Sequence, residues 1–183
     1  MAALALLFGI GLGVVGVRFI SGWNGDRPLI RDTSAVVTEV QGLNQLVTVR
    51  YVLEKVVILE DVKWYGESRV LLVAHGVAKA GVDLARISPR DIKTSGNTVS
   101  IKLPKPQLLD VYLDDRKTEV VERSTGLLRG FDKDLEQDAR RQAVDKLRSA
   151  AYDAGILKDA KERAQVQLGE TFRRLGFVEV RFE

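Results

Sequence analysis

Charged residues within residues 81–91 form the grouping that most resembles a site for chemistry. The segment GVDLARISPRD places Asp83, Arg86 and Asp91 around a predicted turn. A carboxylate beside an arginine can form the rim of a ligand site, and Asp83 or Asp91 could act as a general base. Asp83 could also accept hydrogen bonds from backbone N–H groups of the turn. We favour this structural role and keep all three residues as interaction candidates.

His75 is the only histidine, and it lies in the apolar stretch VLLVAHGVA. Serine–histidine catalysis or metal binding needs partner residues, and the sequence offers none at a recognisable spacing. We interpret His75 as a structural or sheet-surface residue. The absence of cysteine excludes disulfides, thiol catalysis and cysteine-based zinc sites. We therefore predict no catalytic residue, no metal site and no cofactor, and we favour a protein that is not an enzyme.

Two clusters of acidic residues have simpler explanations than ligand binding. Asp114 and Asp115 precede Arg116 and Lys117, which indicates a solvated turn, because a calcium site needs several oxygen ligands at set spacings. Four more acids lie near the start of a predicted helix, where they favour the positive end of the helix dipole. These are Asp132, Asp134, Glu136 and Asp138.

The charge pattern argues against a nucleic-acid partner. The 183 residues carry a net charge of +3 and are 45% hydrophobic and 29% charged. Lysine and arginine alternate with aspartate and glutamate instead of gathering on one face, as they do in nucleic-acid binders. The charged residues begin only at Arg18, so the first segment has a different character from the rest.

The N-terminal segment predicts a single membrane anchor. Residues 1–17, MAALALLFGIGLGVVGV, contain no charged side chain, and Arg18 and Trp23 follow. A membrane-spanning helix needs about 20 mainly apolar residues, a length reached if Arg18 extends to the headgroups and Trp23 lies at the interface. A cleaved signal peptide would have a basic start and an A-x-A-like site, and both are missing. We predict an anchor over residues 1–23 that contacts the lipid bilayer through residues 2–20.

Glycines in the anchor match G-x-G-x-x-G over residues 11–16. A dinucleotide site would need a strand before the motif and a helix after it, and the residues that follow break a helix. Small residues also fall on one helical face, where they would let membrane helices pack closely and form a homo-oligomer. The alternative is that glycine is simply frequent in membrane helices. The packing candidates are Ala5, Gly9, Gly13 and Gly16.

The remaining chain predicts a linker and one water-soluble domain. Residues 24–44 are rich in turn formers in their first part and read as the linker. Strands are expected at residues 46–59, 70–78, 97–103, 117–123 and 177–182, and residues 107–113 are ambiguous. The stretch 70–78 is apolar at successive positions, which predicts a central strand covered on both faces. Residues 79–81 are expected to turn the chain.

Two helices are expected in the C-terminal third. Apolar residues recur at three- and four-residue steps over 131–154 and over 156–175, with Gly155 and Gly176 as the end signals. The order of elements predicts an α+β domain over residues 45–183, with a mainly antiparallel sheet and both helices on one face. We expect the final strand to return to this sheet, since an exposed apolar edge invites aggregation.

Four short motifs, in order, resemble a bacterial family of membrane-anchored domains of unknown function, number 4230 in its series. They are GVDL at 81–84, LPKP at 103–106, GIL at 155–157 followed by Ala160, and LGF at 175–177 before Val180. The likeness runs from about residue 46 to the C-terminus. The resemblance implies an N-terminal membrane helix followed by an α+β domain, and it brings no established activity or site residue.

The side of the membrane is open at this stage. Arg18, Arg27 and Arg31 follow the anchor, and the positive-inside rule then favours a cytoplasmic domain. The family resemblance favours the extracytoplasmic side, which we prefer slightly. We expect a single-pass, non-catalytic interaction or scaffold module that self-associates. The alternatives are an envelope-associated hydrolase and a module that binds a lipid or an envelope polymer.

Overall fold

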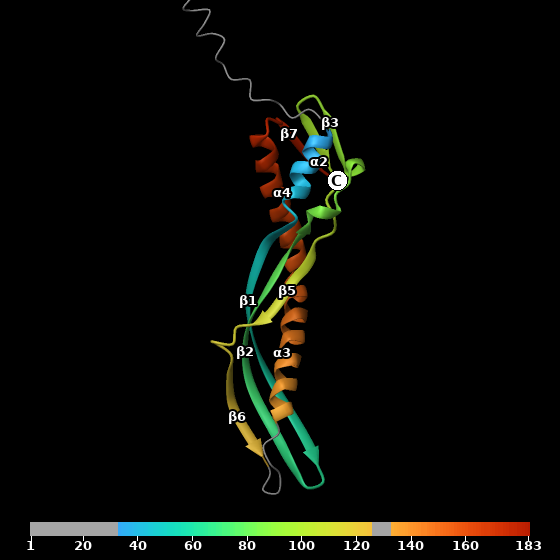
Figure 1. Cartoon of the computed structure of the whole chain (residues 1–183). Helices are drawn as coiled ribbons and strands as arrows, with labels where there is room; N and C mark the ends of the chain where they lie inside the picture. Colours follow the sequence, from blue (N-terminus) through green and yellow to red (C-terminus); the bar gives the residue numbers. More distant parts are fainter. Residues whose placement is uncertain (1–32, 126–132) are drawn as a thin grey trace, which may run out of the picture.

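A long antiparallel hairpin runs along most of the molecule (Figure 1). The computed structural model describes residues 33–125 and 133–183. Strand β1 (Gln45–Lys63) pairs with β2 (Gly66–Asp83) along their whole length. At about 3.3 Å per residue, strands this long span about 60 Å. The turn predicted at residues 79–81 is wrong, because these residues continue β2 and pair with β1.

Two shorter strands extend the sheet on the other edge of β2. Strand β5 (Gln107–Leu113) pairs with one half of β2, and β6 (Glu119–Thr125) pairs with the other half. Both run antiparallel to β2, so they form an interrupted third strand. The ambiguous residues 107–113 are therefore a strand.

Helices α3 (Lys133–Asp153) and α4 (Ile156–Arg174) follow one another along one face of this sheet (Figure 1). Their buried side chains are mostly alanines and leucines spaced four apart, which lets the helix backbones approach the strands closely. Gly155 separates the helices with a positive φ of 82°, a conformation that favours glycine. The buried residues on this line are Leu135, Ala139, Ala143, Leu147, Ala151, Ile156, Ala160, Ala164 and Leu168.

A second, smaller sheet closes one end of the molecule. It consists of β3 (Ile92–Ser95), β4 (Thr98–Ile101) and β7 (Glu179–Phe182). The final strand was expected in the main sheet, and this is wrong: β7 pairs parallel with β4. The cause is the direction of α4, which carries the chain to this end, where Phe172 and Phe177 pack edge to face.

Helix α2 (Thr33–Gly42) packs into the same end. Its side chains Val36, Val37 and Val40 join a core with Leu168 and Phe172. This helix lies within the segment 24–44 that the sequence analysis treated as a linker. Three valines on one helical face explain its burial, because they can cover apolar surface together.

The fold class is α+β, with an antiparallel sheet and two C-terminal helices, as expected. Strand β2 is central, as expected. The expected cover on both of its faces is wrong for the described residues, because α3 and α4 lie on one face and no other described helix covers the second (Figure 1). The predicted anchor, residues 1–23, lies outside the described residues. None of the helices within residues 33–125 and 133–183 is long and apolar enough to cross a membrane.

Candidate functional site

The face of the main sheet opposite α3 and α4 carries apolar side chains that no described helix covers. We call this surface the open face. Val52 is 66% exposed and Val56 is 53% exposed, whereas Val57, which points toward α3, is fully buried. Successive side chains of a strand point to opposite faces of the sheet, and this alternation identifies the residues of the open face. The large apolar residues of the open face are Val52, Val56, Ile58, Val62, Leu71, Val73, Val77 and Tyr112.

Ion pairs and a histidine–glutamate contact cross the open face between the apolar side chains. Arg69 lies 3.3 Å from Glu60, His75 lies 3.5 Å from Glu54, and Lys79 lies 3.8 Å from Asp110. The Lys79 ammonium also lies 5.0 Å from the ring centre of Tyr112. Protein interfaces are enriched in aromatic residues and depleted of lysine, glutamate and aspartate at their core, so the aliphatic and aromatic side chains are the part of the open face that resembles an interface.

The turn between β1 and β2 adds two aromatic residues at the far end. Trp64 is 95% exposed. The rings of Trp64 and Tyr65 lie edge to face, with centroids 5.2 Å apart. The turn therefore presents apolar surface to solvent at the tip of the hairpin.

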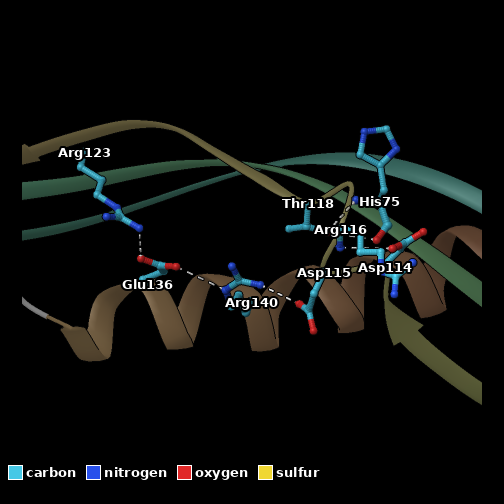
Figure 2. Close-up of polar contacts among 8 residues, drawn as sticks. All are labelled: His75, Asp114, Asp115, Arg116, Thr118, Arg123, Glu136 and Arg140. Carbon is cyan, nitrogen blue, oxygen red and sulfur yellow. Dashed lines mark hydrogen bonds and ion pairs between the residues drawn. The ribbon is translucent and has the colours of Figure 1, made fainter.

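The turn at residues 114–118 lies between β5 and β6, beside His75 (Figure 2). The Asp114 backbone N–H donates to the His75 carbonyl oxygen at 2.8 Å, and the Thr118 hydroxyl lies 3.2 Å from the His75 nitrogen and from its carbonyl oxygen. The backbone N–H and carbonyl groups of His75 therefore have hydrogen-bond partners at the position on β2 where the third strand is interrupted. The His75 ring points away from α3 toward Glu54 on the open face, so Thr118 contacts its backbone and not its imidazole.

An ion-pair chain fixes β6 and this turn to α3 (Figure 2). Glu136 pairs with Arg123 of β6 and lies 3.4 Å from Arg140. Arg140 in turn donates to Asp115 of the turn at 2.9 Å. Glu136 was expected to act only on the helix dipole, and the structure adds this bridging role.

The candidate Asp83 is the last residue of β2 and precedes a short 3₁₀ turn, Leu84–Arg86, which contains the candidate Arg86. The candidate Asp91 ends a second 3₁₀ turn, Pro89–Asp91. The Asp83 carboxylate accepts from the Ala85 N–H at 3.2 Å and pairs with Arg86 at 3.1 Å. This confirms that its carboxylate caps the turn. Any contact of these residues with a ligand stays a prediction.

Asp91 closes the second turn. Its carboxylate accepts from the Ser88 hydroxyl at 2.6 Å and from the Ser88 backbone N–H at 2.9 Å. These hydrogen bonds, the hydroxyl first, hold the pKa of Asp91 below its ordinary value. An open polar depression lies beside it, lined by Arg90, Asp91, Lys93, Ser100, Lys102 and Glu183.

No group of three His, Asp or Glu side chains in the described part of the chain is arranged to hold a metal ion. The membrane-helix packing candidates Ala5, Gly9, Gly13 and Gly16 lie outside the described residues. The open face was not predicted from the sequence. Apolar residues occur at both odd and even positions of 70–78, and this pattern was interpreted as burial of both faces.

These features define an elongated α+β domain with one helix-covered and one open sheet face. The chain belongs to the family described as Protein of unknown function (DUF4230), whose family model matches residues 38–182. The match covers the main sheet, both C-terminal helices and the second sheet. No curated protein and no solved structure matches the chain.

Proposed function

We propose that the chain is a single-pass, membrane-tethered interaction module that is not an enzyme and that self-associates through the open face. The observation that carries this proposal is the row of uncovered aliphatic side chains on β1, led by Val52, Val56 and Ile58. Monomeric proteins rarely expose large contiguous apolar patches, and such patches mark interaction sites.

Burial of the apolar side chains of the open face is the energetic term that supports association. Full burial of a valine or isoleucine side chain stabilises a structure by about 1.5–3 kcal/mol. Several such side chains on each copy can together offset the roughly 4–15 kcal/mol that association costs in lost freedom. The Arg69–Glu60 ion pair and the His75–Glu54 contact lie between the apolar groups and would supply orientation.

The surroundings of the acidic candidates support a non-catalytic role. Asp83 is engaged by a backbone N–H and by Arg86, and Asp91 is engaged twice by Ser88. A lowered pKa keeps the Asp91 carboxylate ionised and a weak base, whereas general bases work best with a pKa near the operating pH.

The tether follows from the apolar N-terminal sequence, residues 1–23, which is long enough to span a bilayer if Arg18 and Trp23 lie at its boundary. The first described element after that segment is α2, which lies at the end of the molecule that holds the second sheet (Figure 1). The hairpin turn with Trp64 would then project away from the tether.

Charge substitution on the open face tests the proposal. We expect Val56→Glu in the full chain in detergent to abolish the oligomer in native mass spectrometry. The matched control is Val166→Glu on α4, since Val166 is similarly exposed at 61% but lies off the open face. A wild-type chain that is strictly monomeric at membrane-like density would contradict self-association.

The tether has its own test. Full-length chain should stay with membranes after an alkaline carbonate wash, and a chain lacking residues 1–23 should be released. A reporter fused to the C-terminus would establish the side of the membrane, for which we prefer the extracytoplasmic side. Release of the full-length chain by carbonate would contradict the anchor.

A further inference from the structure

We propose that the outer edge of β1 binds an extended segment of a partner protein, which joins the main sheet as a further strand. The inference goes beyond the proposed function and does not depend on self-association through the open face. Two features carry it. The first is the unpaired backbone of β1, which defines the kind of partner, and the second is a hollow between this edge and α3.

Strand β1 forms one edge of the main sheet. It pairs with β2 on one side, and no described strand pairs with it on the other (Figure 1). In an antiparallel pair, every second residue directs its N–H and C=O groups away from the neighbouring strand. A row of donors and acceptors therefore follows the outer edge. From Val52 to Glu60, no residue of 33–125 or 133–183 forms a hydrogen bond with this row.

The edge at residues 52–60 has few of the features with which natural sheets prevent further pairing. Those features are short edge strands, prolines, bulges and charged side chains. Strand β1 has 19 residues, and its pairing irregularity lies outside the segment, at 47–49. The stretch VVIL at 56–59 contains no charge and no proline. A long, apolar edge of this kind favours the addition of a strand.

A hollow lies between this edge and α3. It has a volume of about 420 Å³ and is lined by Lys55 of β1 and by α3 residues spaced three and four apart. These α3 residues lie beside the buried line of the helix, on the side of β1. Side chains of an added strand that point toward α3 would enter this hollow. The α3 residues are Gln142, Asp145, Lys146, Ser149, Ala150 and Asp153.

The two sides of the edge define the side chains that suit the partner. On the α3 side, the lining of the hollow is mostly polar and charged, so polar side chains fit there. On the other side, Val52, Val56 and Ile58 are exposed next to the edge, so apolar side chains fit. Because successive side chains of a strand alternate between faces, the partner segment alternates polar and apolar residues. Backbone hydrogen bonds would supply affinity, and the alternate side chains would supply specificity.

A second copy of the chain suits this edge less well than another protein does. Its own β1 would pair antiparallel, about a two-fold axis normal to the sheet. Helix α2 lies at one end of the molecule (Figure 1), so this arrangement would direct the two α2 ends away from each other. Two chains tethered in one membrane need both α2 ends on the same side.

Peptide binding to the full chain in detergent tests the inference. The probe is a fluorescent nonapeptide in which valine and threonine alternate, with two further versions N-methylated at every valine or at every threonine. We expect the unmethylated peptide and only one methylated version to bind, since alternate amides of a strand donate to its neighbour. The other version should bind about tenfold or more weakly. Equal binding of both methylated versions, or no binding of the unmethylated peptide, would overturn the inference.

Two variants of α3 locate the bound peptide. Ser149→Trp fills the hollow and should weaken binding by about tenfold or more. Gln137→Trp is the matched control, because Gln137 is exposed on α3 but does not line the hollow, and its binding should be unchanged. Equal binding by both variants would overturn the assignment to this edge.

Hydrogen exchange of the backbone amides gives an independent readout. Bound peptide should slow exchange within residues 52–60, and slower exchange only elsewhere on the sheet would overturn the inference. Protection of 52–60 without peptide that is lost on dilution would indicate a second copy at this edge, which would overturn the choice of partner. None of these outcomes depends on whether Val56→Glu abolishes the oligomer, so the two proposals can fail separately.

Discussion

The side chain of Leu147 on α3 lies directly over Gly76 on β2, where the sheet presents no side chain to the helix. A Cβ added at Gly76 would overlap a methyl group of Leu147 and would lie 2.8 Å from the Tyr112 carbonyl oxygen. Leu147 is fully buried at this place. The glycine therefore sets how closely α3 approaches the middle of the sheet.

Gly76→Ala should destabilise the domain by about 1–3 kcal/mol, the usual effect of overpacking a core. Urea unfolding of the full chain in detergent measures it. Gly42→Ala is the control, because no atom lies within 4 Å of a Cβ there. We expect the effects of Gly76→Ala and Leu147→Ala to be less than additive, since the second removes the clash with the leucine methyl and leaves only the close contact with the Tyr112 carbonyl oxygen. Full additivity would contradict the contact.

Gly81→Ala should be more harmful than Gly76→Ala. A Cβ at Gly81 would overlap the carbonyl oxygen of Leu46, at the irregularity where the pairing of β1 and β2 shifts between Val47 and Val49. Main-chain atoms cannot move aside as a leucine methyl can, so the strands must separate locally. The same urea measurement tests the order, and a cost at Gly81 smaller than at Gly76 would contradict it.

Glu136 should contribute more to stability than Asp115, although both bind Arg140. Glu136 bridges Arg123 and Arg140 and its side chain is 20% exposed, whereas the Asp115 side chain is 81% exposed. We expect Glu136→Gln to cost about 1 kcal/mol and Asp115→Asn less than about 0.5 kcal/mol. Thermal unfolding at low and high salt checks this, because screening should reduce the Glu136 effect. Equal losses would contradict the bridging role.

Ser88→Ala should raise the pKa of Asp91 toward its ordinary value, because the strongest hydrogen bond to the carboxylate is lost. In the wild type the folded pKa lies below the unfolded value of about 3.9. Its contribution to stability is therefore present above that value and is lost as pH falls through the folded pKa.

A carboxyl NMR titration measures this shift. Glu179 serves as the internal control, since the pKa of its carboxyl is lowered chiefly by the hydrogen bond from Arg181, at 2.8 Å, and not by Ser88. An Asp91 pKa unchanged by Ser88→Ala would contradict the capping interaction.

Local pattern predicted much of this fold. The four-residue spacing of Ala139, Ala143 and Leu147 predicted α3, and Gly155 was expected to end it. The cap made by Asp83 was likewise readable from its place beside a turn. In each case the determining interaction lies within a few residues along the chain.

Long-range relationships could not be predicted in this way. The pairing of β7 with the main sheet or with β4 depends on the position at which α4 ends. The sequence of residues 70–78 has the same apolar pattern whether a helix or a second molecule covers the strand. The open face therefore appeared only when the positions of α3 and α4 were known.

A distance between copies tests the central proposal most directly. Val56→Cys in the otherwise cysteine-free full chain is labelled with a nitroxide and reconstituted in bilayers at high lipid dilution, with Val166→Cys as the control. Dipolar spectroscopy should detect a short intermolecular distance for the label at Val56 and a clearly longer or unresolved one at Val166. Absence of intermolecular coupling at Val56, in a chain shown to be folded, would contradict self-association through the open face.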